Sequence, residues 1–174
     1  MFQIPARAAD GSKNMDVKIF TTGGTIDKVY FDAKSTYEVG DPQIVDILRE
    51  ANVTIDWELE TLFRKDSLDL TDEDRAVIVE KVRQEPCPRI LITHGTDTMI
   101  ETAKALQGIP GKTIVLVGSL SPARFKSSDA EFNIGFALAA VQTLPPGVYI
   151  AMNGRIFHPD RVRKNREANR FEPI

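Results

Sequence analysis

The chain has 174 residues, of which 42% are hydrophobic and 27% are charged, values typical of a globular protein with a substantial core. Its formal net charge of -3 argues against general nucleic-acid binding, which usually needs a basic surface. No apolar run approaches the ~20 residues that span a bilayer, so we expect no membrane partner. The single cysteine, Cys87, cannot form an internal disulfide, and the first residues lack the apolar core of a signal peptide; both points favour the cytoplasm.

The first half of the chain alternates strand and helix patterns. We expect residues 1–15 to form a flexible lead-in and Asp16–Thr22 to form the first strand. Asp41, followed by proline, is typical of a helix start, with the aspartate as N-cap. Val53–Phe63 alternates in part, as a strand does, and Thr71 should cap a second helix. The apolar face of that helix is predicted to carry Val77, Ile78 and Val82.

The second half continues the same alternation. Arg89–Thr93 and Thr113–Gly118 are short apolar runs that predict buried strands, and Val148–Met152 is the last clear strand. The spacings Thr98-x-x-Glu101 and Ser128-x-x-Glu131 predict capping boxes at two helix starts. Strands and helices therefore follow one another in a β-α-β-α order.

Strands that are continuously apolar, separated by helices, are typical of a parallel sheet covered on both faces. We therefore predict an α/β fold, a Rossmann-like and mostly parallel sheet with helices on both faces, in a single domain over residues 16–174. In such sheets ligands bind beyond the carboxyl ends of the strands, so the residues at those ends are the candidates for function.

After the first strand comes the run TTGGTID, residues 21–27. Two adjacent glycines let the backbone turn sharply and approach a ligand closely, and their N–H groups can stabilise an oxyanion. Thr25 follows them and would point its hydroxyl into that space. Taken alone, the motif fits an ordinary Gly-Gly turn with polar flanks equally well.

After the third strand comes His94-Gly-Thr-Asp-Thr98. If Thr98 caps the next helix, Thr96 and Asp97 have no structural duty, although Asp97 could be the cap with the box shifted by one. A hydroxyl beside a carboxylate at a strand end is chemically useful. His94 could act as a base, but a histidine at a strand end is more often packed and hydrogen-bonded, and we favour that interpretation.

Threonine is a weak nucleophile at neutral pH and needs a neighbouring base. A buried lysine beside a carboxylate can take this role, because burial makes a lysine less basic. Lys164 lies in the basic run Arg161–Arg166. Taken alone, this run is more typical of a solvated surface.

Together these segments resemble the bacterial-type L-asparaginases. TTGGTID and HGTDTMIET resemble the two signature segments of that family, and four weaker segments agree with it in order and spacing across residues 17–170. The weaker segments are Ser35–Gly40, which resembles the family's lid, Asp66–Thr71, which resembles its substrate-carboxylate loop, Val117–Pro122 with Phe132-Asn133, and Met152–Gly154 with Val162–Lys164.

The resemblance implies hydrolysis of L-asparagine to L-aspartate and ammonia by double displacement at a threonine, with no metal or organic cofactor. It implies two catalytic groups, Thr25 with its activator Tyr37, and the cluster Thr96, Asp97 and Lys164. Ser67 and Asp97 would hold the α-carboxylate and the α-amino group. The implied substrate-binding residues are Gly24, Ser67, Leu68, Gly95, Thr96 and Asp97.

The sequence also departs from the family. Longer members have a second, C-terminal α/β domain, whereas this chain ends soon after Lys164, so it resembles a short member made of the N-terminal domain alone. We expect weak substrate binding, because fewer charge-assisted contacts remain. Leu68 replaces a polar residue, which predicts weak activity on glutamine. We also expect a homo-oligomer, through open-edge strands at Val53–Phe63 or Thr113–Gly118 or through the basic tail Arg155–Ile174.

Three alternatives stay open. The same chemistry could act on D-asparagine or on a peptide-linked amide. A catalytically weak protein of this kind could instead be an amino-acid sensor or an amidotransferase subunit, although retention of both hydroxyls and the lysine argues against pure binding. Nucleic-acid binding through the basic tail is a third alternative, which the acidic remainder of the chain disfavours.

Overall fold

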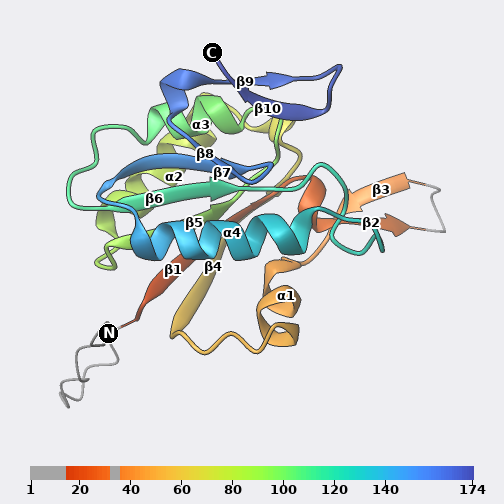
Figure 1. Cartoon of the computed structure of the whole chain (residues 1–174), viewed down its shortest axis with the longest axis horizontal. Helices are drawn as coiled ribbons and strands as arrows, with labels where there is room; N and C mark the ends of the chain where they lie inside the picture. The colour runs from red at the N-terminus through yellow and green to blue at the C-terminus, as the bar shows by residue number, and fades with distance from the viewer. Residues whose placement is uncertain (1–14, 32–35) are drawn as a thin grey trace.

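A six-stranded sheet forms the centre of the computed structural model, which describes residues 15–31 and 36–174 (Figure 1). Its strand order is β4-β1-β5-β6-β7-β8. The first five strands run parallel, and only β8 is antiparallel to its neighbour, so the expected mostly parallel sheet is confirmed. In chain order the strands are β1 (Val17–Gly23), β4 (Trp57–Lys65), β5 (Arg89–Thr93), β6 (Thr113–Val117), β7 (Gly147–Met152) and β8 (Arg155–Phe157).

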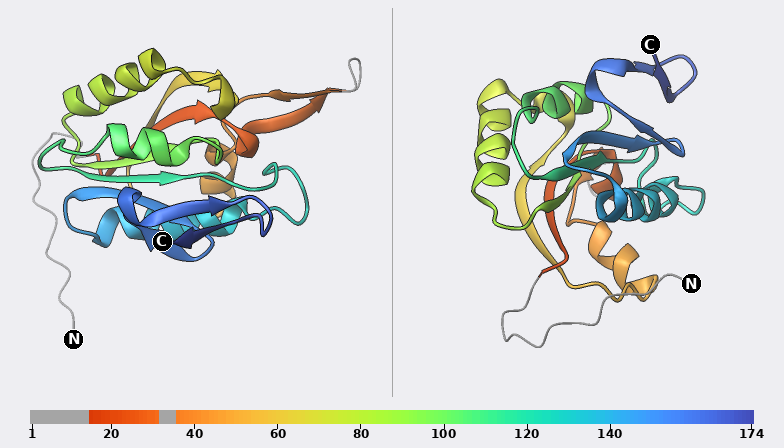
Figure 2. Two further views of the ribbon diagram at one scale, coloured as in Figure 1. Left: turned by 90° about the horizontal axis from the view of Figure 1, so that it is seen from above. Right: turned by 60° about the vertical axis from the view of Figure 1, so that its left-hand side comes forward.

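Helices cover both faces of this sheet, as Figure 2 shows in its right-hand view. Helices α1 (Ile44–Glu50) and α4 (Ala130–Thr143) lie on one face, and α2 (Asp72–Gln84) and α3 (Met99–Ala105) lie on the other. β5 and β6 are buried along almost their whole length, because side chains on both faces meet a helix layer. None of the helices in the described residues is long and apolar enough to cross a membrane.

Two antiparallel hairpins stand outside the sheet (Figure 1). One is formed by β2 (Lys28–Phe31) and β3 (Thr36–Val39), and β3 lies in the segment Ser35–Gly40 that resembles a lid. Ser35, the first residue of the lid-like segment, lies outside the described residues, as do residues 1–14 of the expected lead-in. The other hairpin is formed by β9 (Val162–Asn165) and β10 (Arg170–Pro173). Three 3-10 turns complete the described elements, η1 (Thr25–Asp27), η3 (Ser67–Asp69) and η4 (Pro159–Arg161).

Of the four expected helix starts, only that of α2 has the predicted cap. Thr71 and Asp74 form a reciprocal capping box there. Helix α1 starts at Ile44 with Gln43 as N-cap, so the prediction of Asp41 as N-cap was wrong. The Asp41 carboxylate instead pairs with Arg64 at 2.8 Å.

The two other capping boxes were also wrong, because the polar side chains have tertiary partners. Thr98 occupies the N-cap position of α3 without a cap hydrogen bond, and its hydroxyl donates to the carbonyl of Ser67 at 2.7 Å. Helix α4 begins one residue after Asp129, whose carboxylate accepts hydrogen bonds from the backbone N–H groups of Leu120 and Ser121. The loop after β6 is thereby fastened to the start of α4.

Further expectations about strands and faces need correction. Val148–Met152 lies in β7, but three short strands follow it. β4 is an edge strand of the sheet, as expected for Val53–Phe63, whereas β6 lies between β5 and β7 and has no open edge. On α2, Ile78 and Val82 are fully buried, but Val77 is 46% exposed and faces away from the core.

Candidate active site

Three loops meet backbone to backbone at the carboxyl ends of β1, β4 and β5. A Cβ atom added to Gly24 would lie 2.4 Å from both Cα and N of Gly95, and one added to Gly95 would lie 2.6 Å from Oγ of Ser67. Gly24 also has a φ of 95°, a conformation that side chains rarely adopt. Only glycine at positions 24 and 95 lets the loops approach this closely, so Thr25, Ser67 and Thr96 converge.

Hydrogen bonds hold these loops to the strand ends. The hydroxyl of Thr22 donates to the carbonyl of Thr93 at 2.9 Å, which joins the ends of β1 and β5. The N–H of Gly24 donates to the carbonyl of Lys65 at 2.9 Å, which joins the ends of β1 and β4. That N–H is thus already satisfied, and Gly24 contributes to the site through close packing.

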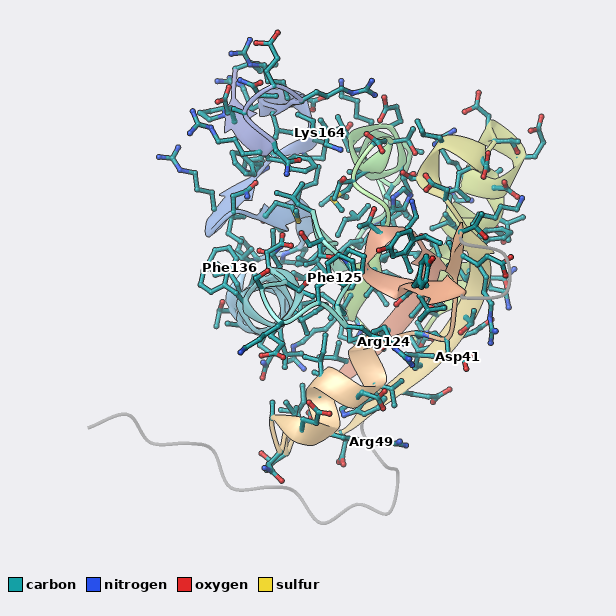
Figure 3. All side chains as sticks on the ribbon, turned by 90° about the vertical axis from the view of Figure 1, so that its right-hand side faces the viewer. Asp41, Arg49, Arg124, Phe125, Phe136 and Lys164 are labelled. Carbon is teal, nitrogen blue, oxygen red and sulfur yellow. The ribbon has the colours of Figure 1, made fainter. Side chains whose placement is uncertain are left out.

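Lys164 joins two of the predicted site residues. Its Nζ donates to Oγ1 of Thr96 and to Oδ1 of Asp97, each at 2.8 Å. Thr96 is 5% exposed, and the Lys164 side chain is 14% exposed, so the contact is shielded from solvent. Figure 3 labels Lys164 on the side of its hairpin that faces the loop before α3. The cluster expected from the family resemblance is therefore assembled.

The β9–β10 hairpin explains how a residue of a basic run becomes a site residue. Along β9 the side chain of Val162 is buried, that of Arg163 is exposed and that of Lys164 turns inward, because strand residues alternate between faces. Opposite Lys164, Phe171 is buried, and its N–H donates to Oδ1 of Asn153 at 2.8 Å. The run is therefore not uniformly solvated, because Lys164 turns inward while Arg163 is exposed.

A second cation lies near the same carboxylate. A guanidinium nitrogen of Arg166, Nη2, is 3.8 Å from Oδ1 of Asp97, and the Arg166 side chain is 73% exposed. Arg166 could not be singled out from the sequence, because a residue in a loop beyond a short strand has no periodicity to reveal its neighbours.

The Ser67 hydroxyl is a buried polar group without a partner. Ser67 is 1% exposed, and its Oγ has no hydrogen bond among the described residues. Its loop is held by the ion pair of Lys28 with Asp66 at 2.6 Å. Burial pushes the pKa of the Asp66 carboxyl up, but hydrogen bonds from Lys28 and from the N–H of Leu68 together hold it below its usual range. Leu68 itself is 65% exposed.

Tyr37 and Thr25 are not joined in this structure. Thr25 is half-buried in η1, whereas Tyr37 is 50% exposed on β3, and no hydrogen bond links these two described residues. The Tyr37 ring lies between two aromatic neighbours, with centroids 5.3 Å from Tyr30 and 6.1 Å from Phe125. Activation of Thr25 by Tyr37 therefore stays a prediction.

His94 is packed and hydrogen-bonded, as favoured. It is 0% exposed, with Nδ1 2.7 Å from the carbonyl of Gly95 and Nε2 2.8 Å from the hydroxyl of Thr102. Burial lowers the pKa of the imidazole to about 4. A neutral ring that donates at Nδ1 and accepts at Nε2 satisfies both contacts, so His94 holds the loop and is not available as a base.

This histidine predicts a pH dependence of stability. Its folded pKa lies below the ordinary value of 6.5, so its contribution is fully present above about pH 6.5 and is lost as pH falls toward 4. Between about pH 7 and pH 5 we expect a loss of about 2 kcal/mol from this residue, at ~1.4 kcal/mol per unit. The free energy of unfolding in urea, measured at both pH values for the parent and for His94→Gln, checks this. Equal pH dependence of parent and variant would contradict it.

The arrangement can support acyl transfer. It offers two threonine hydroxyls, a carboxylate and an unpartnered buried hydroxyl on three adjoining loops, and the amine of Lys164 reaches them from the β9–β10 hairpin. Within residues 15–31 and 36–174, no group of three or more His, Cys, Asp or Glu residues could hold a metal ion. Fold and site thus define a mostly parallel α/β protein that gathers hydroxyl, carboxylate and amine groups at one edge of its sheet.

Comparison with known proteins gives the family. The family model described as Asparaginase, N-terminal matches residues 16–172, so the chain belongs to the asparaginase family. The L-asparaginase of Thermococcus kodakarensis is 33% identical over 158 residues, which are 86% of this chain and 48% of that protein. A subunit of the glutamyl-tRNA(Gln) amidotransferase of Saccharolobus islandicus is 34% identical over 152 residues, or 79% of this chain and 33% of that protein.

Solved structures agree with this assignment. The structure of the thermostable L-asparaginase from Thermococcus kodakarensis matches with a TM-score of 0.78 at 30% identity, over 91% of this chain and 51% of that one. A probable cytoplasmic L-asparaginase from Campylobacter jejuni matches with a TM-score of 0.75 at 28% identity, over 90% and 52% of the two chains. The chain spans about half the length of the L-asparaginases that it matches.

Proposed function

We propose that this protein hydrolyses the side-chain amide of L-asparagine to L-aspartate and ammonia by double displacement at a threonine. The observation that supports this most is the position of Lys164, whose Nζ lies 2.8 Å from both Thr96 Oγ1 and Asp97 Oδ1. A lysine held against a hydroxyl and a carboxylate is equipped to move the hydroxyl proton.

The proposed reaction has two steps. A threonine Oγ attacks the amide carbon, the C–N bond breaks, and the nitrogen leaves as ammonia with the proton that the hydroxyl gave up. Water then attacks the resulting ester, which releases aspartate and restores the hydroxyl. Lys164 would relay the proton from Thr96 or from water beside it, with Asp97 holding the amine in place. Thr25 and Thr96 are the two candidates for the attacking residue, with Tyr37 as the proposed activator of Thr25.

We propose that the amino-acid end of the substrate binds at the Ser67 loop. A buried hydroxyl without a partner costs free energy, so a ligand oxygen that accepts its hydrogen bond would be favoured. The substrate's α-carboxylate can supply that oxygen, and the Asp97 carboxylate can attract the α-amino group. Gly24 and Gly95 let the three loops pack closely enough for one substrate to reach both the Ser67 loop and the threonines. We propose no metal or organic cofactor.

The direct test is ammonia release from millimolar L-asparagine by the parent, by Lys164→Met and by the control Lys104→Met. Lys104 is exposed on α3, so its loss should change nothing. The proposal requires an active parent, an active control and a folded Lys164→Met variant with little or no activity. A folded parent that releases no ammonia would refute it.

The second candidate is an amidotransferase component or a catalytically weak amino-acid sensor. It is favoured by the 34% identity to the amidotransferase protein of Saccharolobus islandicus, which this chain matches over 33% of that protein's length. A parent that releases no ammonia, yet melts at a higher temperature when aspartate or asparagine is added, would favour this candidate.

We expect weak activity on glutamine. Its additional methylene moves the amide away from the threonines when the amino-acid end is held at Ser67, and Leu68 offers no hydrogen bond to correct it. The kcat/KM for glutamine should be lower than that for asparagine by about tenfold to 200-fold, the usual effect of one methylene. Coupled ammonia assays on both amides measure the ratio, and similar values for the two would rule out this reason for specificity.

We also propose that the protein forms a homo-oligomer and works in a reducing, cytoplasmic setting. β4 is an edge strand whose apolar side chains, among them Trp57 and Phe63, are only partly buried, and a second copy could cover it. A buried free cysteine, Cys87, fits a reducing compartment. Light scattering that gives the monomer mass at working concentration would refute the oligomer.

A further inference from the structure

A buried carboxylate lies two residues after Thr25. Asp27 ends η1 and is only 2% exposed. Its N–H donates to the carbonyl of Gly24 at 3.2 Å, so its backbone belongs to the turn that carries Thr25. Burying a carboxylate costs free energy unless it is hydrogen-bonded or paired, so the contacts of Asp27 matter.

Asp27 holds the two ends of the segment that follows the β2–β3 hairpin. Its Oδ1 accepts a hydrogen bond from the N–H of Gln43 at 2.8 Å, immediately before α1. Its carbonyl accepts a hydrogen bond from the N–H of Gly40 at 2.8 Å, immediately after β3. One residue of the Thr25 turn therefore fixes both where the hairpin ends and where α1 begins.

The same contacts reach the loop between β6 and α4. The side-chain oxygen of Gln43 accepts a hydrogen bond from Nε of Arg124 at 3.0 Å, and the carbonyl of Ile26 accepts one from the N–H of Ala123 at 3.1 Å. Phe125, which follows Arg124 in that loop, packs its ring against the Tyr37 ring. Figure 3 shows Arg124 between α1 and the hairpin, with Phe125 farther along the same loop.

We propose that Asp27 is a positioning residue for the Thr25 site, whose carboxylate and carbonyl fasten the return of the β2–β3 hairpin to the Thr25 turn and so set how Tyr37 approaches Thr25. Tyr37 lies on β3, three residues before Gly40, and the short connection transmits the position of Gly40 to it. This inference rests on the proposed function and goes beyond it, because it assigns a role to a side chain that does not contact substrate.

The charge of Asp27 makes the contact to Gln43 sensitive to pH. Burial, with a smaller contribution from the Asp41 carboxylate, raises the pKa of the carboxyl to about 6, against the opposing effects of the Gln43 N–H and of Arg64. The charged groups that act on the Asp27 carboxylate are Arg64, on β4, and Asp41, in the segment before α1. Arg124 contacts Gln43, the hydrogen-bond partner of Asp27. Lys28, on β2, is instead paired with Asp66. As pH falls through 6, protonation weakens the charge-assisted bond to Gln43.

The first test follows Asp27 without any assay of activity. We expect the backbone N–H of Gln43, observed by NMR on the full chain, to shift with a midpoint near pH 6 in the parent and not in Asp27→Asn. The asparagine oxygen can accept the same hydrogen bond but does not titrate in this range. The control is Asp41→Asn, a neighbouring carboxylate that is 79% exposed, which should keep the transition and move its midpoint slightly lower.

The second test is the pH dependence of ammonia release. The parent should lose kcat on the acid side with a midpoint near pH 6, Asp27→Asn should lack that step while staying active, and Asp27→Ala should lose about tenfold to hundredfold in kcat at neutral pH. A Gln43 amide that does not titrate, or an acid step that is unchanged in Asp27→Asn, would overturn the proposal. A parent without activity would refute the proposed function, and the Gln43 titration would then decide whether Asp27 holds the turn.

Discussion

Thr25→Ala and Thr96→Ala should each lower ammonia release from L-asparagine by at least about a thousandfold and leave the fold intact. When several residues act as one catalytic unit, removing any one of them abolishes nearly all of the rate enhancement, so a loss of about a thousandfold or more is expected. Among the described residues, neither hydroxyl makes a hydrogen bond on which the core depends, and that of Thr96 is contacted by Lys164. Circular dichroism and thermal melting should therefore match those of the parent.

The matched control is Thr143→Ala. Thr143 is the last residue of α4, is exposed, and donates its hydrogen bond to the carbonyl of Ala139 within its own helix. Its loss should leave activity unchanged. If either site variant kept more than about a tenth of the parent activity, that threonine would be neither the nucleophile nor part of the unit. If a labelled acyl-enzyme formed on only one of them, the order of attack would also be known.

Gly95→Ala should disrupt the site strongly, although it leaves the reactive side chains untouched. The new Cβ would lie 2.6 Å from Cβ and Oγ of Ser67, and 3.1 Å from the Ser67 backbone N. The clash is with the backbone and the short, buried side chain of Ser67, which cannot move aside. The loop that carries Gly95 and the Ser67 loop must therefore separate. Overpacking of this kind costs about 1–3 kcal/mol, and a displacement of about 1 Å at a reacting centre can cost a hundredfold in rate.

Gly24→Ala should be worse for stability, because it adds an unfavourable φ of 95° to a contact of 2.4 Å with backbone. Strain in this region adds about 1–3 kcal/mol to the cost of the clash. The control is Gly135→Ala in the middle of α4, where a Cβ would meet nothing within 4 Å. That change should stabilise the protein by about 0.5–1 kcal/mol, since alanine favours helices. Unfolding in urea measures all three, and a Gly95→Ala variant as stable and active as the parent would show that the loops do not need this contact.

The sequence determined the sheet and the faces that it buries. Runs such as Arg89–Thr93 are continuously apolar, and a strand covered on both faces must be, so the bounds of β5 agree with the prediction and the parallel sheet follows from the alternation with helices. The glycine pair and the signature threonines also lay where the sequence indicated, because they follow strands directly and strand ends in a parallel sheet share one edge.

Only the tertiary structure decided what the polar side chains do. Thr98 and Asp41 carry good helix-cap signals, yet their partners are the Ser67 carbonyl and Arg64, because a cap competes with any stronger contact that folding brings near. Lys164 was assigned to the site by family resemblance, since its own neighbours in sequence indicate a solvated surface, and the β9–β10 hairpin turns it inward. Asp27 lies in the signature TTGGTID but the sequence suggested no role for it, because its partners Gly40 and Gln43 become neighbours only when the hairpin folds back on the Thr25 turn. Local pattern fixes which residues are buried, whereas pairing between polar groups far apart in sequence depends on where the loops meet.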